Sequence, residues 1–101
     1  MFFTKRKFAT MSMEDAKKEL ETDLNIILID VREPEEYAQR HIPNSKNVPI
    51  SNIEGISNAV PDKSARIFVY CLSGARSRRA CGIFAELGYT DVTNIGGINA
   101  W

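Results

Sequence analysis

The stretch VYCLSGARSRRACG, from Val69 to Gly82, places a cysteine before a glycine-containing loop and three arginines. An apolar segment precedes Cys71 and a helical pattern follows it, so the thiol stands at the junction of a strand and a helix. The unpaired amides and positive dipole end of a helix N-terminus stabilise a thiolate, and a nearby arginine has the same effect. Cys71 is therefore a candidate nucleophile.

The loop after Cys71 consists mainly of short or permissive residues. Gly74 adopts φ values that other residues avoid, so the loop amides can point inward toward the sulfur. Arg76 offers planar donors to an oxyanion or to the sulfur itself. This spacing predicts an anion-binding cradle with a nucleophile at its floor. The expected site consists of Cys71 as the nucleophile and, around it as substrate-binding residues, Leu72, Ser73, Gly74, Ala75, Arg76 and Ser77.

Length and composition are typical of one small globular domain. A chain of 101 residues has room for one core, so we expect residues 1–101 to form a single domain. Hydrophobic residues make up 44% and charged residues 26% of the chain, which is ordinary for a folded protein. Because 13 basic residues balance 13 acidic ones, overall charge indicates neither a nucleic-acid nor a membrane partner.

The cysteine content and the first residues favour a cytoplasmic protein. The opening MFFTKRKFATMS lacks the long apolar core of a signal peptide, and no apolar run in the chain is long enough to cross a membrane. A small secreted scaffold normally carries more than the two cysteines present here, Cys71 and Cys81. Cys81 lies beside the apolar stripe of a helix, so we expect it to pack in the core. The alternative is a disulfide partner for Cys71.

Strand and helix patterns alternate along the whole chain. This alternation predicts an α/β fold with a mostly parallel sheet covered on both faces and right-handed crossovers. Ligands of such folds bind at the carboxyl ends of the strands, where Cys71 is expected. The predicted strands cover residues 8–11, 25–30, 46–48, 66–70 and 92–94, and the predicted helices cover residues 13–21, 34–40, 51–60 and 77–87.

Local signals set several boundaries of these elements. Ser12, with Asp15 three residues later, has the spacing of a capping box and begins the first helix. Gly88 stands where the C-terminal cap of the helix over residues 77–87 is expected. The pair Gly96 and Gly97 predicts a turn after the last strand.

Beyond these signals, the sequence resembles the rhodanese-like sulfurtransferases over most of its length, from about Phe8 to Trp101. The resemblance rests on several separated motifs that occur in the family's order. They are LIDVREPEEY (28–37), HIPNSKNVP (41–49), VYCLSGARS (69–77), AELGYTDV (85–92) and IGGINAW (95–101). The resemblance implies the rhodanese-like fold, a three-layer α/β/α arrangement with a mostly parallel central sheet.

The resemblance also implies a chemistry for the cradle. In that family the loop cysteine takes a sulfane sulfur from thiosulfate or a persulfide and carries it as a cysteine persulfide. It then passes the sulfur to a thiophilic acceptor such as a thiol or cyanide. Carried over, Cys71 is the nucleophile and sulfur carrier, and the amides of residues 72–76 stabilise the persulfide. The resemblance implies no metal or organic cofactor, and it adds a sulfur-relay protein as a candidate partner.

Two features of the loop bear on the reaction and its substrate. Phosphatases of the cell-division-cycle type resemble the family in fold but place five residues between cysteine and arginine, whereas four separate Cys71 from Arg76 here. The shorter loop suits a sulfur atom better than a phosphate group. Thiosulfate-using members often carry a basic residue where this chain has Leu72, which predicts a persulfide as the better donor. A non-catalytic regulatory or binding module, and a phosphatase or arsenate reductase, stay open as alternatives.

The other polar residues have simpler interpretations. His41, the one histidine of the chain, is expected to be a hydrogen-bonded structural residue of the HIPN turn. Asp30 and Arg32 are expected to form an ion pair or to cap a turn, with a supporting role at the site as the alternative. Arg78 and Arg79 fit a solvated helix face, or else they attract anionic donors or an acidic partner.

The remaining two expectations concern the surface. The acidic residues Glu33, Glu35 and Glu36 are expected to be solvated at a helix N-terminus, which negative charge favours. Trp101 is expected to pack against the edge of the sheet.

Overall fold

The computed structural model describes residues 7–101, so the first six residues of the opening segment lie outside the described residues. Within residues 7–101 the chain alternates between strands and helices, as the sequence predicts. The elements are β1 (Ala9–Thr10), α1 (Met13–Thr22), β2 (Ile27–Asp30), α2 (Pro34–Gln39), β3 (Lys46–Asn47), η1 (Ile50–Gly55), α3 (Ile56–Ala59), β4 (Ile67–Cys71), α4 (Ala75–Glu86), β5 (Val92–Gly97) and η2 (Ile98–Ala100).

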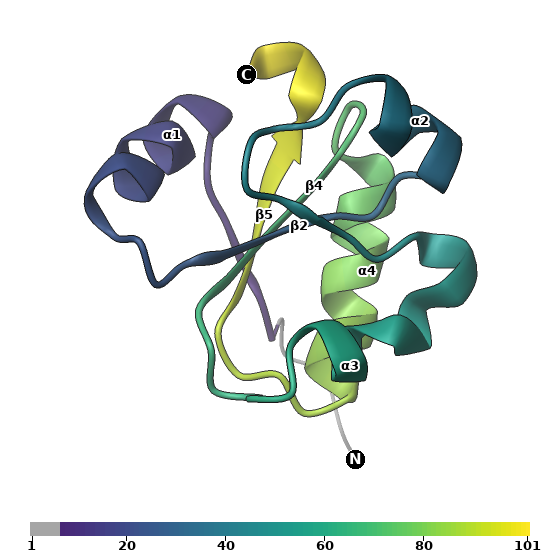
Figure 1. Cartoon of the computed structure of the whole chain (residues 1–101). Coiled ribbons are helices and arrows are strands. Elements are labelled where there is room, and N and C mark those ends of the chain that lie inside the picture. Colours follow the sequence, from purple (N-terminus) through teal and green to yellow (C-terminus); the bar gives the residue numbers. More distant parts are fainter. Residues whose placement is uncertain (1–6) are drawn as a thin grey trace.

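The strands form one sheet in the order β1-β5-β4-β2-β3, and every described pair is parallel. Helix α1 covers one face, and α2, α3 and α4 lie on the other (Figure 1). The expected three-layer α/β/α arrangement is confirmed, with a sheet that is parallel throughout. Because β4 lies between β2 and β5, its carboxyl end opens at the middle of the sheet.

Strand β4 sets the direction of the candidate nucleophile. All five of its residues are buried, and successive side chains point to opposite faces of a sheet. Ile67, Val69 and Cys71 belong to the core cluster on the α4 face. Phe68 and Tyr70 belong to the cluster on the α1 face. The Cys71 thiol therefore points toward α4.

The predicted starts of two helices can be compared with the structure, at α1 and at α4. Helix α1 begins as predicted, and the Asp15 amide donates to the Ser12 hydroxyl oxygen at 3.1 Å. Helix α4 begins at Ala75, two residues before the predicted start at Ser77. Gly74 has a left-handed φ of 113°, which turns the chain sharply from β4 into the helix.

The predicted double-glycine turn is wrong. Gly96 and Gly97 are the last residues of β5, and the chain turns only afterwards, in η2. The register between β4 and β5 shifts here: Val69 pairs with Asn94, whereas Tyr70 pairs with Gly96. One residue of β5 is therefore unpaired, as in a β-bulge. Local composition does not distinguish a turn from a bulge, because glycine occurs in both.

A buried ion pair holds the segment after β2. The Arg32 Nη2 atom lies 2.9 Å from Oδ2 of Asp30, and both side chains are buried, which confirms the expected pairing. Tyr70 adds a second link, because its hydroxyl oxygen accepts the amide of Ile42 at 3.0 Å. These contacts fix the segment that carries α2 against the carboxyl end of the sheet.

Among residues 7–101, no helix is long and apolar enough to cross a membrane.

Candidate active site

Cys71 is the last residue of β4, and its side chain is almost completely buried, at 1% exposed. Its thiol is free of any disulfide. The amide of Gly74 donates a hydrogen bond to the sulfur, with a distance of 3.0 Å between N and Sγ. The chain thus curls around the sulfur and directs a backbone donor at it, as the sequence predicts.

The surroundings of Cys71 favour its thiolate. Burial acts against ionisation, but hydrogen bonds outweigh it and lower the pKa of Cys71 below its usual value. The donors are the Ser77 hydroxyl and the amides of Ser77, Gly74 and Ser73. A lowered pKa increases the thiolate fraction at neutral pH, and the thiolate is the nucleophilic form.

Ser77 joins the helix to the sheet below the loop. It is fully buried on the first turn of α4, and its hydroxyl donates to Oδ1 of Asn94 at 2.7 Å. The same oxygen of Asn94 accepts the amide of Gly96 at 3.1 Å. A hydroxyl rotates and carries one hydrogen, so Ser77 donates to Asn94, to the Gly74 carbonyl oxygen 3.0 Å away or to the Cys71 thiolate. Sequence patterns did not single out Asn94, although an asparagine next to the apolar residues of a strand is a usable signal.

Gly97 provides the space into which the loop folds. It pairs directly with Cys71 across β4 and β5, and the loop folds back over that position. A Cβ atom at Gly97 would lie 2.0 Å from the Leu72 carbonyl oxygen and 2.5 Å from Cα of Ser73. The amide of Asn99 in η2 donates to the same Leu72 carbonyl at 3.4 Å. A side chain at position 97 is therefore incompatible with this loop.

Arg76 forms a bidentate ion pair with Glu36 of α2. Nη1 lies 2.7 Å from Oε1 and Nη2 lies 3.0 Å from Oε2. In this structure a carboxylate from a different helix, and not the sulfur, accepts from these donors, whereas the expected contact with an oxyanion stays a prediction. Hydrogen bonds from Arg76, and then from the Glu33 amide, lower the pKa of Glu36 to about 2. The same pair raises the pKa of Arg76.

The acidic residues around α2 are less uniform than the sequence indicates. Glu36 also accepts the amide of Glu33 at 3.0 Å, as in a capping box. Glu33 itself accepts the hydroxyl of Ser51 at 2.6 Å. Of the three acids, Glu35 alone is exposed, and the other two are partly buried. The helix N-terminus is confirmed, whereas the prediction of a merely solvated acidic surface is wrong for Glu36.

The predicted site residues divide into a buried floor and an open rim. Cys71 and Ser77 are buried, and Gly74 and Arg76 are partly buried. Leu72 is 41% exposed. Exposed residues beside it on the loop and the first turns of α4 are Ser73, Ala75, Arg78 and Arg79.

Three residues singled out in the sequence lie apart from this arrangement. Cys81 is fully buried, and burial raises its pKa to about 12, which confirms core packing. His41 has the expected hydrogen bond, with Nδ1 2.8 Å from the Tyr37 carbonyl oxygen. Trp101 is 40% exposed and lies beneath the Lys17 ammonium, 4.8 Å from the ring centre, so it is less packed than expected.

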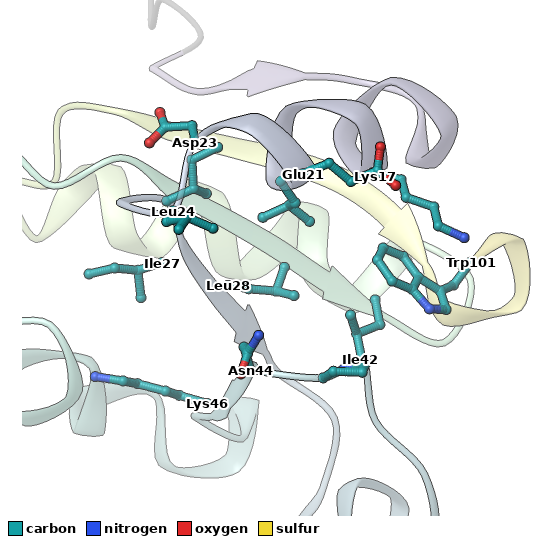
Figure 2. A pocket seen from close by; sticks show the side chains of 13 residues that line it. Lys17, Glu21, Asp23, Leu24, Ile27, Leu28, Ile42, Asn44, Lys46 and Trp101 are labelled. Carbon is teal, nitrogen blue, oxygen red and sulfur yellow. The ribbon is translucent and has the colours of Figure 1, made fainter.

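A groove of about 510 Å³ lies on the α1 side of the sheet. Figure 2 shows the indole of Trp101 beside Lys17 in this groove. Its lining mixes apolar and charged side chains, and none of residues 71–77 contributes to it. The groove is therefore separate from the cysteine cradle.

Among residues 7–101, no three His, Cys, Asp or Glu side chains gather in a way that could hold a metal ion.

Comparisons with known proteins agree with this geometry. The family described as Rhodanese-like domain matches residues 12–101. The chain is 46% identical over 71 residues to Thiosulfate sulfurtransferase PspE of Escherichia coli (strain K12), which covers 69% of this chain and 68% of that protein. It is 34% identical to Thiosulfate:glutathione sulfurtransferase of Saccharomyces cerevisiae, over 89% and 75% of the two chains. A solved structure described as rhodanese with anions from E. coli superposes with a TM-score of 0.71 at 43% identity, covering 75% of this chain and 91% of that one.

Proposed function

The chain belongs to the family of rhodanese-like domains and is a sulfurtransferase, and from this premise we propose that Cys71 carries the transferred sulfur as a persulfide. The observation that carries the proposal is the position of Cys71 at the floor of the loop. Its sulfur accepts the Gly74 amide at 3.0 Å, and its pKa is lowered despite burial. The proposed site consists of Cys71 and residues 72–77 around it.

The proposed reaction has two steps, and each is a displacement at sulfur. In the first, the Cys71 thiolate attacks the sulfane sulfur of the donor. A new S–S bond forms to Cys71 while the donor's own bond to that sulfur breaks, so thiosulfate leaves as sulfite and a persulfide leaves as a thiolate. In the second, a thiolate or cyanide attacks the outer sulfur of the Cys71 persulfide. The acceptor leaves with the sulfur, and the Cys71 thiolate is regenerated.

The loop amides stabilise the anionic persulfide in this proposal. Donors that are fixed in place before the reaction need no reorganisation when charge moves from the inner to the outer sulfur. The link from Ser77 to Asn94 and the close packing of Leu72 over Gly97 hold the loop in this position. The proposed mechanism needs no cofactor, because the cysteine supplies the nucleophile and the donor supplies the electrophilic sulfur.

A persulfide is the proposed donor class. Thiosulfate is a small dianion. Position 72 of the loop is an apolar leucine, whereas a basic residue at this position would attract the dianion electrostatically. A persulfide of a small thiol or of a relay protein carries less charge at its sulfane sulfur. We also propose that residues 1–101 act as one domain in a reducing, cytoplasmic environment, where the thiol of Cys71 stays available.

Intact-mass spectrometry tests the carrier role of Cys71. Wild type, Cys71→Ser and Cys81→Ser are incubated with thiosulfate and, separately, with glutathione persulfide. We expect wild type and Cys81→Ser to gain one sulfur, cyanide to remove it, and Cys71→Ser to gain none. The persulfide should load the protein faster than thiosulfate does.

Two results would contradict the proposal. A sulfur gain that survives Cys71→Ser would place the carrier elsewhere. Absence of any gain in wild type from both donors would favour a non-catalytic module. Hydrolysis of a phosphate ester by that same preparation would favour the phosphatase alternative, and reduction of arsenate to arsenite with a thiol as the reductant would favour the arsenate reductase alternative.

A further inference from the structure

We propose that Glu36 determines which donor the site accepts, because it neutralises Arg76 and so disfavours small dianions such as thiosulfate relative to persulfides. The inference rests on the sulfur-transfer function proposed above, and it assigns a specificity role to a residue of α2 that lies outside the cysteine loop in sequence.

The first support is the geometry of the ion pair. Both terminal nitrogens of Arg76 donate to the carboxylate of Glu36, at 2.7 and 3.0 Å. Such a two-bond pair is stronger and more directional than a single contact. An incoming anion therefore competes with a carboxylate that already occupies the donors of Arg76.

The second support is the way in which Glu36 is held. Its Oε1 atom also accepts the amide of Glu33 at 3.0 Å, so the carboxylate is fixed at the start of α2. The side chains of Glu36 and Arg76 are 33% and 34% exposed, which leaves the pair open to solvent on one side. The carboxylate is thus pre-positioned, while the guanidinium can still be reached by a ligand.

The third support is the charge of the cradle. Arg76 carries the one basic side chain of residues 71–77, and it lies near enough to feel the negative charge of the Cys71 thiolate. With Glu36 ionised, the thiolate has no uncompensated cation on this loop. The positive charge of Arg32 also acts on Glu36, but Arg32 is itself paired with Asp30. Arg78 and Arg79 are exposed on α4, where water and salt screen them.

These charges have different consequences for the two donor classes. Thiosulfate concentrates its two negative charges in one small ion, so it meets the Cys71 thiolate and the Glu36 carboxylate at close range. Glutathione persulfide carries at most one charge at its sulfane sulfur, and its carboxylates lie many bonds away. Electrostatic repulsion therefore disfavours the binding of thiosulfate more than that of the persulfide. The loop amides are sufficient to bind the persulfide.

The variant Glu36→Gln removes the charge and keeps the fold. A glutamine at this position still accepts the Glu33 amide, because a capping box tolerates either residue. It also leaves the full positive charge of Arg76 available to a ligand. The exposed neighbour Glu35 provides the matched control, since Glu35→Gln removes the same charge from the same helix at a position outside the pair.

The experiment measures KM and kcat for thiosulfate and for glutathione persulfide in wild type, Glu36→Gln, Glu35→Gln, Arg76→Gln and the double variant Glu36→Gln/Arg76→Gln. We expect Glu36→Gln to lower KM for thiosulfate about tenfold relative to KM for the persulfide, because one unit charge acts on a dianion at short range. The new thiosulfate KM should rise with salt. Glu35→Gln should keep the wild-type ratio, and the gain should vanish when Arg76 is also replaced.

Three outcomes with these variants would overturn the inference. One is an unchanged ratio of the two KM values in Glu36→Gln, and another is an equal loss of kcat/KM for both donors, as expected from a merely structural role. The third is a gain that persists without Arg76. In each of these cases the proposed function still stands if wild type forms the Cys71 persulfide, whereas failure of wild type to accept sulfur from either donor would contradict both the proposed function and this inference.

The variant Glu36→Asp keeps the charge, so it should keep the preference for persulfide. A preference of Glu36→Asp for thiosulfate would also count against the proposal.

Discussion

The hydroxyl of Ser77 lies 2.7 Å from Oδ1 of Asn94, although 17 residues separate the two in sequence. This hydrogen bond ties the first turn of α4 to β5, directly below the loop that surrounds Cys71. Asn94 also accepts the amide of Gly96 at 3.1 Å. The position of the helix N-terminus relative to the sulfur therefore depends on the neighbouring strand as well as on the loop.

Replacing Ser77 by alanine should raise the pKa of Cys71. The variant removes the hydroxyl that is the largest favourable influence on the thiolate, and loss of a hydrogen bond that favours the charged form moves the pKa of the thiol upward. The pH dependence of Cys71 alkylation by iodoacetamide, followed by mass spectrometry, measures this change. Ser57→Ala, on an exposed residue of α3, is the control. An unchanged alkylation midpoint in Ser77→Ala would show that the amides alone stabilise the thiolate.

Replacing Asn94 by alanine should destabilise the fold. Asn94 is buried, and its loss removes an acceptor from the Ser77 hydroxyl and from the Gly96 amide, so we expect a cost of about 1 to 3 kcal/mol. Urea unfolding measures this free energy. Asn99→Ala changes an exposed side chain and should stay within about 0.5 kcal/mol of wild type. Equal stability of the two variants would argue against the structural importance of the Asn94 link.

Gly97→Ala should prevent the loop from closing. The added Cβ would lie 2.0 Å from the Leu72 carbonyl oxygen, so the backbone must shift, at a cost of about 1 to 3 kcal/mol or more. We expect loss of sulfur loading together with lower stability in urea. Gly82→Ala is the contrasting variant: its Cβ would have open space, with Phe8 4.0 Å away. Inside α4 it should stabilise the protein by about 0.5 to 1 kcal/mol. Full sulfur loading by Gly97→Ala would contradict the close-packing argument.

The ion pair of Glu36 and Arg76 should make stability depend on acid pH. The pKa of Glu36 is about 2 in the folded protein and about 4.3 in an unfolded chain. The pair therefore stabilises the fold fully above about pH 4.3, and this contribution disappears as the pH falls toward 2. Because about a third of each side chain is exposed, we expect only about 1 kcal/mol from it. Urea unfolding at several pH values should show wild type and Glu36→Gln converging in acid. A difference that is constant with pH would rule out this origin.

Much of the fold and the position of the candidate nucleophile follow from the sequence alone. The alternation of apolar strands and amphipathic helices determines the α/β class, since each pattern has one way to bury its apolar face. Cys71 could be placed at the carboxyl end of a strand, and its loop could be predicted, because residues 71–77 are contiguous and their effects are local. Core packing of Cys81 follows in the same way from the apolar stripe of its helix.

Only the tertiary structure decided what surrounds that loop. Arg76 meets Glu36 across 40 residues, and no local pattern distinguishes a paired arginine from one that faces a ligand. Gly97 was predicted to lie in a turn because glycine has the same local signal in turns and in close contacts. Its actual role arises from the Leu72 carbonyl, which the β4–β5 pairing places over it. Sequence patterns thus determined the candidate nucleophile and the backbone around it, whereas long-range packing determined which charges lie beside that loop.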